Sequence, residues 1–148
     1  MNRKYIRIIL CWLAVLLWMI LIFSLSSQVA DESSRLSTGI TQIIVKMVNE
    51  VVPNINFDLN KFGHVIRKCA HFFEYLVMGI FVINAMKRKQ YKYIALLICI
   101  LYAITDEFHQ RFVPGRGPGI KDVLIDSIGA SVGIWMYLSL RNLFRNKK

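Results

Sequence analysis

The sequence predicts an all-α fold, a bundle of four transmembrane helices, and three observations lead to that prediction. The chain of 148 residues is 55% apolar or aromatic and has a mean hydropathy of +0.46, which is high for a soluble domain with a polar surface. Apolar runs of membrane-spanning length recur along the chain. The net charge of +10 comes from basic residues beside those runs, a distribution typical of a membrane protein rather than of a nucleic-acid binder.

The first predicted span covers residues 8–27, which carry no charged side chain. About 20 residues rising about 1.5 Å each cross a hydrocarbon core about 30 Å thick. The basic flank of this run also fits a secretory signal peptide. However, the run is longer than a usual signal core and no convincing cleavage site follows it. We therefore expect an uncleaved span.

Three further spans are predicted at about 67–86, 92–110 and 121–142, and the chain 1–148 is treated as one domain. The second span has polar residues in its first third, and the third meets Asp106 and Glu107. The fourth contains Gly129 and Gly133, a spacing of small residues that lets helices approach closely.

The long connection between the first two spans has an amphipathic pattern. Its apolar residues recur at helical spacing between Leu36 and Val51, and Pro53 follows. This pattern predicts an interfacial amphipathic helix in the first extracytoplasmic loop. A helix packed on the bundle is the alternative.

The charge distribution predicts the orientation of the bundle. One side of the membrane has no acidic residue, and its basic residues are Arg3, Lys4, Arg7, Lys87, Arg88, Lys89, Lys92, Arg141, Arg145, Lys147 and Lys148. The opposite side holds all 9 acidic residues. Because basic loops stay in the cytoplasm, both termini are expected to be cytoplasmic.

Polar side chains gather near the extracytoplasmic ends of three spans. The sets that share one helical face, at offsets of three and four, are Lys68, His71, Glu74 and Tyr75; Asp106, His109 and Gln110; and Asp122 and Asp126. Counting about 1.5 Å per residue outward puts carboxylates of all three spans within roughly 10 Å of the outer surface. Ionisable groups at that depth are costly in lipid, so we expect them to face one another inside the bundle.

The stretch RFVPGRGPGIKD joins the last two spans, and its two Pro-Gly pairs predict tight turns on either side of Arg116. An arginine on such a loop can form paired hydrogen bonds with a phosphate or carboxylate. Together with Lys68 and Arg111, it predicts a cationic rim above a carboxylate floor. The candidate acid–base residues are His71, Glu74, Asp106 and Glu107, and the candidate ligand-binding residues are Lys68, Tyr75, Gln110, Arg116, Asp122 and Asp126.

Several functions are compatible with such a pocket. The favoured one is recognition of an anionic lipid or a lipid-linked cell-envelope intermediate, and the alternative is an enzyme using acid–base chemistry on a lipid-linked phosphate or sugar. A purely structural network is less favoured, because interhelical hydrogen bonds average only about 0.6 kcal/mol. A metal site is disfavoured because Lys68 and Arg116 would repel a cation. The sequence identifies no cofactor, predicts no nucleic-acid partner and leaves a homodimer open.

The same residues carry a resemblance to a known family. The matching stretches are FSLSSQ (23–28), KCAHFFEYLVMG (68–79), DEFHQRFVPGR (106–116) and KDVLIDSIGASVG (121–133). Through them the chain resembles VanZ-like membrane proteins over nearly its whole length. One departure is Asp126, where the family often has Asn, so the resemblance does not imply a charge there.

The resemblance implies a multi-pass protein of the bacterial plasma membrane. The family's named member is associated with reduced susceptibility to teicoplanin-type glycopeptides, but no settled biochemical activity comes with the family. The resemblance therefore indicates a cellular location and an association with glycopeptide susceptibility, but no mechanism.

The predicted orientation can be tested by thiol labelling. In a chain whose own cysteines have been removed, Lys147→Cys should be unreactive to a membrane-impermeant maleimide added outside intact cells, because the basic C-terminal tail is expected in the cytoplasm. The same site should react after the cells are opened. Rapid labelling in intact cells would overturn the placement of every polar residue described above.

Overall fold

The architecture comes from a computed structural model, which describes residues 3–28, 39–40, 42–44, 46, 59–87, 89–115 and 119–146. The helices in these ranges are α1 (Arg3–Ser26), α3 (Leu59–Met86), α4 (Lys92–Gln110) and α5 (Ile120–Asn146), with the short 3-10 helix η1 (Lys89–Tyr91) before α4. No strand occurs among the described residues. The predicted all-α class is confirmed.

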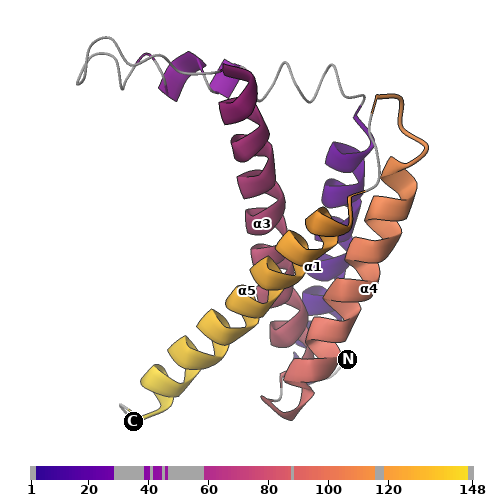
Figure 1. The fold of residues 1–148 in the computed structure, drawn as a ribbon. Coiled ribbons are helices and arrows are strands. Elements are labelled where there is room, and N and C mark those ends of the chain that lie inside the picture. Colours follow the sequence, from indigo (N-terminus) through magenta and orange to yellow (C-terminus); the bar gives the residue numbers. More distant parts are fainter. Residues whose placement is uncertain are drawn as a thin grey trace.

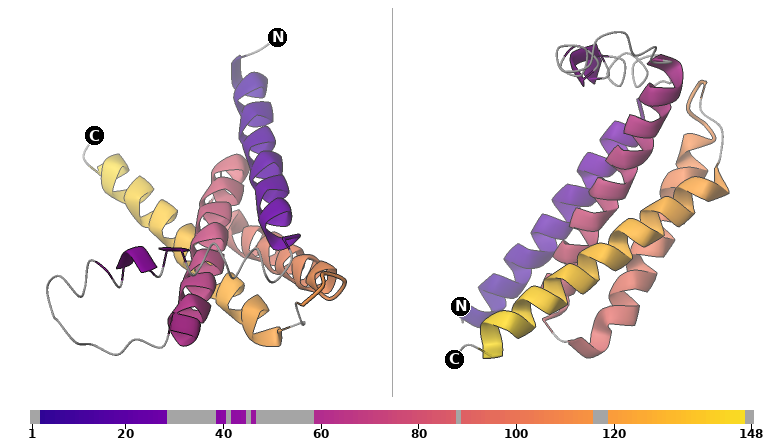
Figure 2. Two further views of the ribbon diagram at one scale, coloured as in Figure 1. Left: turned by 90° about the horizontal axis from the view of Figure 1, so that it is seen from above. Right: turned by 60° about the vertical axis from the view of Figure 1, so that its left-hand side comes forward.

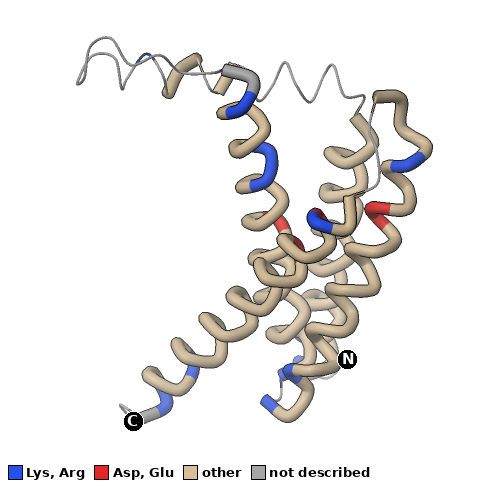
Figure 3. The backbone as a smooth tube through the Cα atoms, in the orientation of Figure 1, with Lys and Arg blue, Asp and Glu red and all other residues tan. Residues whose placement is uncertain are grey.

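Successive helices of the bundle run in opposite directions (Figure 1). The two termini therefore lie at one end, and the connection between α4 and α5 lies at the other. Figure 3 shows Lys and Arg positions at both ends of the bundle, whereas the Asp and Glu positions among the described residues lie away from the end that holds the termini. The side without acidic residues that the sequence predicts is thus the end of the bundle that holds the termini.

Three of the described helices contain segments long and apolar enough to cross a membrane: Tyr5–Ser26, Lys61–Met86 and Ile120–Arg145. Apolar side chains lie on the outside of the bundle, where Leu17 is 67% exposed and Trp135 is 69% exposed. Carboxylates lie inside, where Asp106 and Asp126 are each 2% exposed. A soluble protein has the reverse distribution, and this one is typical of a membrane protein.

Helix α4 coincides with the predicted third span but is not one of those three segments. Its last turns carry Asp106 and Glu107, which lower its mean hydropathy although both side chains are buried. A helix of 19 residues extends about 28 Å, close to the thickness of the hydrocarbon core. The fourth crossing stays a prediction.

The helices are longer than the predicted spans at several ends. Helix α3 begins at Leu59 rather than near residue 67, and α1 and α5 continue into their basic flanks. The reason is that Phe62, Val65 and Ile66 extend the helical apolar pattern of α3 beyond its polar residues. The span boundaries were inferred from hydrophobicity, which does not determine where a helix ends.

The predicted interfacial helix lies largely outside the described residues. Of the segment 36–51, residues 39–40, 42–44 and 46 are described and all are helical. Ile40 and Ile43 are exposed. Its placement on a membrane surface remains a prediction.

Helix α3 is the centre of the bundle and packs against α1, α4 and α5 (Figure 2). Its most extensive contact is with α5, and glycines make that contact possible. A Cβ atom at Gly133 would meet the backbone carbonyl of Leu76, and one at Gly79 would meet the backbone of Ala130. Gly129 lies against the α3 backbone in the same way. The predicted close approach of helices at Gly129 and Gly133 is confirmed, and Gly79 is its counterpart on α3.

A second stripe of small side chains sets the position of α4. Ala95, Cys99 and Ala103 are fully buried at intervals of four residues. One turn further along the same face come Asp106 and Gln110, which are also buried. The packing that holds α4 in the bundle therefore directs its polar residues inward.

The glycine contact yields a stability prediction. Gly133→Ala should lower the free energy of unfolding by about 1–3 kcal/mol, because the new methyl group would push the Leu76 carbonyl and separate α3 from α5. Thermal unfolding of the detergent-solubilised protein measures the loss. Gly39→Ala is the matched control, since nothing lies within 4 Å of a Cβ at Gly39. Equal melting of the two variants would contradict glycine-dependent packing.

Candidate functional site

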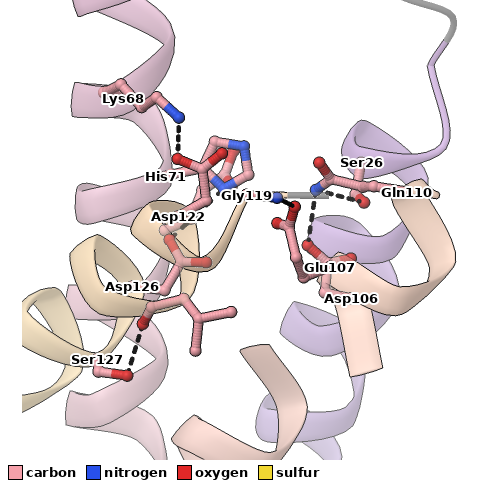
Figure 4. A network of polar contacts seen from close by, with 12 residues as sticks. Ser26, Lys68, His71, Asp106, Glu107, Gln110, Gly119, Asp122, Asp126 and Ser127 are labelled. Carbon is pink, nitrogen blue, oxygen red and sulfur yellow. Dashed lines mark hydrogen bonds and ion pairs between the residues drawn. The ribbon is translucent and has the colours of Figure 1, made fainter. Parts of the chain in front are cut away.

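Polar side chains from α1, α3, α4 and α5 converge near the end of the bundle opposite the termini (Figure 4). We call them the buried polar cluster, and its members are Ser26, His71, Tyr75, Asp106, Glu107, Gln110 and Asp126. His71 is partly buried, and the other members are buried. Because they come from four separate helices, these groups meet only in the folded bundle.

Gln110 ties α4 to α1 inside this cluster. Its side-chain Nε2 donates hydrogen bonds to the Ser26 hydroxyl and to Asp106 Oδ2, both at 3.1 Å. Glu107, one turn earlier, accepts a hydrogen bond from the backbone N–H of Gly119. Glu107 therefore holds in place Gly119, the residue that directly precedes α5.

His71 and Asp126 join α3 to α5. His71 Nδ1 lies 3.5 Å from Asp126 Oδ1, a charge contact when the imidazole is protonated, although it lacks the geometry of a hydrogen bond. Asp126 is 2% exposed. A carboxylate in this position can orient the imidazole and stabilise its protonated form.

Some buried polar atoms of the cluster have no hydrogen-bond partner among the described residues. They include Tyr75 Oη, Asp106 Oδ1 and Asp126 Oδ1. Tyr75 is completely buried, and its hydroxyl interacts electrostatically with both aspartates. Such atoms are rare in folded proteins, since each costs roughly 1–3 kcal/mol when left unsatisfied.

An ion pair lies closer to the end of the bundle. Lys68 on α3 contacts the carboxylate of Asp122, which is in the first turn of α5. Both side chains are partly exposed. A negative charge in the first turn also favours the α5 helix dipole. The charge of Lys68 is therefore partly compensated by its neighbour.

A pocket of about 190 Å³ opens beside this ion pair, and we call it the rim pocket. Its lining residues are His64, Arg67, Lys68, His71, Gln110, Gly115 and Asp122. Arg67 and Lys68 are cationic, and His64 and His71 become cationic on protonation. His71 and Gln110 belong to both the rim pocket and the buried polar cluster, so the two are continuous.

The structure brings most of the predicted site residues together. Lys68, His71, Gln110 and Asp122 line the rim pocket, and Tyr75, Asp106, Glu107 and Asp126 lie in the buried polar cluster. Glu74 is partly buried and interacts electrostatically with His71, while its backbone carbonyl accepts a hydrogen bond of 2.9 Å from Trp18 Nε1. Arg116 lies outside the described residues.

Sequence reasoning missed Arg67 and Ser26. Arg67 stands at the start of the predicted second span and is not among the candidate site residues, yet it lines the rim pocket. Its buried Nε has no hydrogen-bond partner among the described residues. A signal was present, because His64, Arg67 and His71 follow one another at offsets of three and four and so share a helical face. Ser26 lies in the FSLSSQ stretch, but only the fold reveals its hydrogen bond with Gln110.

Within the described ranges, no group of three or more His, Cys, Asp or Glu side chains could hold a metal ion. The chemistry that these residues offer is anion binding at the rim pocket, and hydrogen bonding or proton transfer in the buried polar cluster.

Comparison with known proteins adds the following. The sequence model of the family described as VanZ/LLP1 matches residues 11–144. That range contains every member of the buried polar cluster and every residue lining the rim pocket. Comparisons with curated proteins and with solved structures give no significant match.

The hydrogen bonds of Gln110 lead to a second stability prediction. Gln110→Leu should cost about 1–3 kcal/mol of unfolding free energy, because it leaves the Ser26 hydroxyl and Asp106 Oδ2 buried without their donor. Thr105→Val is the control, since Thr105 is exposed and its hydroxyl bonds only within α4. A double-mutant cycle with Ser26→Ala isolates the bond between the two helices. Strictly additive effects would show that Ser26 and Gln110 are not coupled.

Proposed function

The chain belongs to the VanZ/LLP1 family, and from that premise we propose that it is a multi-pass protein of the bacterial plasma membrane with four spans and both termini in the cytoplasm. This orientation is supported by the end of the bundle that holds the termini, where the described residues include Lys and Arg but no Asp or Glu. The length of α4 and its buried small residues support the fourth span. The rim pocket then faces the extracytoplasmic side.

We propose that the rim pocket binds the anionic headgroup of a lipid or of a lipid-linked cell-envelope intermediate. The observation that carries this proposal is the lining of the pocket, where Arg67 and Lys68 lie beside His64 and His71. Of these groups, Arg67 is best suited to hold a phosphate, because a guanidinium can bond two phosphate oxygens at once. Lys68 already contacts Asp122 and adds mainly electrostatic attraction.

A lipid fits this pocket better than a free soluble anion. The cationic residues lie on α3 within the candidate membrane-spanning segment Lys61–Met86. Val65 is 52% exposed and Phe73 is 60% exposed on the same part of that helix. Acyl or polyprenyl chains can lie along this apolar surface while the phosphate enters the pocket.

A second function is favoured by the contact between His71 and Asp126. An imidazole that faces a buried carboxylate on one side and an anion pocket on the other can transfer protons. In that alternative the protein is an enzyme acting on a lipid-linked phosphate or sugar, with Glu74 or Asp106 as the base. Binding of the headgroup is the first step of either function.

A link to teicoplanin-type glycopeptides would follow if the ligand is a lipid-linked envelope intermediate, because its binding or turnover alters the availability of that intermediate. It would be measured as a change in the minimum inhibitory concentration of teicoplanin when the gene is deleted. No change would limit the proposal to lipid recognition.

Anionic-lipid binding is tested by native mass spectrometry of the purified protein titrated with phosphatidylglycerol and phosphatidylcholine. Arg67→Gln should weaken phosphatidylglycerol binding about tenfold by removing a charge-assisted bond to phosphate. Arg145→Gln is the matched control, since it removes an exposed guanidinium at the opposite end of the bundle. Equal binding by the two variants, or no preference of the wild type for the anionic lipid, would refute the proposal.

The same preparation separates the binder from the enzyme. Glu74→Gln and Asp106→Asn keep the shape of the site and remove the bases, so both should still prefer an anionic lipid to phosphatidylcholine. If the wild type also releases phosphate or sugar from a lipid-linked substrate, the two variants should lose that release. Absence of release by the wild type would leave the binding function alone.

A further inference from the structure

We infer that the headgroup bound here is a polyol phosphodiester: the rim pocket holds its phosphate, and the buried polar cluster receives hydroxyl groups carried by the same headgroup. This inference rests on the proposed function and narrows its ligand to one chemical class. The polyol can be glycerol or a sugar, because both present neighbouring hydroxyl groups.

The first argument is continuity between the two parts of the site. Gln110 lines the rim pocket and donates a hydrogen bond to Asp106, and His71 lines the same pocket and contacts Asp126. A headgroup whose phosphate lies at Arg67 therefore meets Gln110 and His71, the two lining side chains that contact these aspartates. A volume of about 190 Å³ greatly exceeds the ~15 Å³ that one water needs.

The second argument comes from unsatisfied buried atoms. Tyr75 is 0% exposed, and Asp106 and Asp126 are each 2% exposed. Tyr75 Oη and one carboxylate oxygen of each aspartate have no hydrogen-bond partner within the described part of the chain. Asp126 Oδ1 has His71 Nδ1 at 3.5 Å, which leaves Tyr75 Oη and Asp106 Oδ1 as the atoms in need of a partner. Buried polar atoms of this kind favour a bound group that supplies their hydrogen bonds.

The third argument identifies the chemistry of that partner. A second phosphate is disfavoured, because the carboxylates of Asp106, Glu107 and Asp126 would repel it. An ammonium group donates hydrogen bonds but cannot accept the one that Tyr75 offers. A hydroxyl group donates to a carboxylate and accepts from a phenol or an imidazolium. Hydroxyl groups therefore complement the whole set.

The test compares two lipids that differ only in these hydroxyl groups. Phosphatidylglycerol and phosphatidylmethanol carry the same phosphodiester and the same single charge, but the second lacks the glycerol hydroxyls. Native mass spectrometry of the intact purified chain should show about tenfold tighter binding of phosphatidylglycerol, since hydroxyl donors to carboxylates form charge-assisted bonds.

Tyr75→Phe should reduce this preference about fivefold, because it removes only the buried hydroxyl. Tyr93→Phe is the matched control, since Tyr93 is 71% exposed and lies on α4 away from the site. A preference that survives unaltered in Tyr75→Phe would overturn the assignment of the hydroxyls to the buried polar cluster.

The outcomes separate this inference from the proposed function. If neither anionic lipid binds better than phosphatidylcholine, both fail. If both anionic lipids bind equally well, the anion pocket stands and the polyol inference fails. Retention of phosphatidylethanolamine as strong as that of phosphatidylglycerol would assign an ammonium group instead and overturn the inference. A polyprenyl phosphoryl hexose distinguishes the two sources, since tighter binding than phosphatidylglycerol identifies a sugar and weaker binding identifies glycerol.

Discussion

A carboxylate at membrane depth cannot face hydrocarbon, and the arrangement of this bundle depends on that constraint. Asp106 and Asp126 belong to helices whose outward faces are apolar, so each helix must turn its acidic residue inward. Each helix can direct its acidic residue inward only because small residues let neighbouring helices touch. Gly129 and Gly133 bring α5 against α3, and the buried alanines of α4 do the same on its side of the bundle. Close packing of the helices is therefore what allows the acidic residues to lie inside the bundle.

The polar contacts of the site divide into those that hold the helices and those that are left unsatisfied. Gln110 joins α1 to α4, Lys68 with Asp122 joins α3 to α5, and Glu107 secures the connection before α5. These interactions set the relative register of the helices. Tyr75 Oη and Asp106 Oδ1 make no hydrogen bond with any described residue, so they add nothing to this register and cost stability. A network that served only to hold helices together would not retain them, which is why we assign them to ligand recognition.

The same contacts decide which cation serves the rim pocket. Lys68 and Arg67 are neighbours in the chain, and the sequence treated Lys68 as the ligand-binding residue. In the folded bundle Asp122 approaches Lys68, while the buried Nε of Arg67 has no hydrogen-bond partner among the described residues. The ion pair with Asp122 partly compensates the charge of Lys68 and leaves the charge of Arg67 to attract an anion. Helical spacing alone ranks the two residues equally, so this distinction needed the position of α5.

The sequence by itself determined the all-α class, the apolar spans, the basic end and the faces that carry Lys68, His71 and the two aspartates. These features follow from hydropathy and helical periodicity, which are local properties of the chain. Tertiary structure alone decided the hydrogen bond between Ser26 and Gln110, the place of Arg67 in the rim pocket and the unsatisfied hydroxyl of Tyr75. The reason is that hydrogen bonds between helices depend on interaxial distance and rotation, and periodicity within one helix encodes neither.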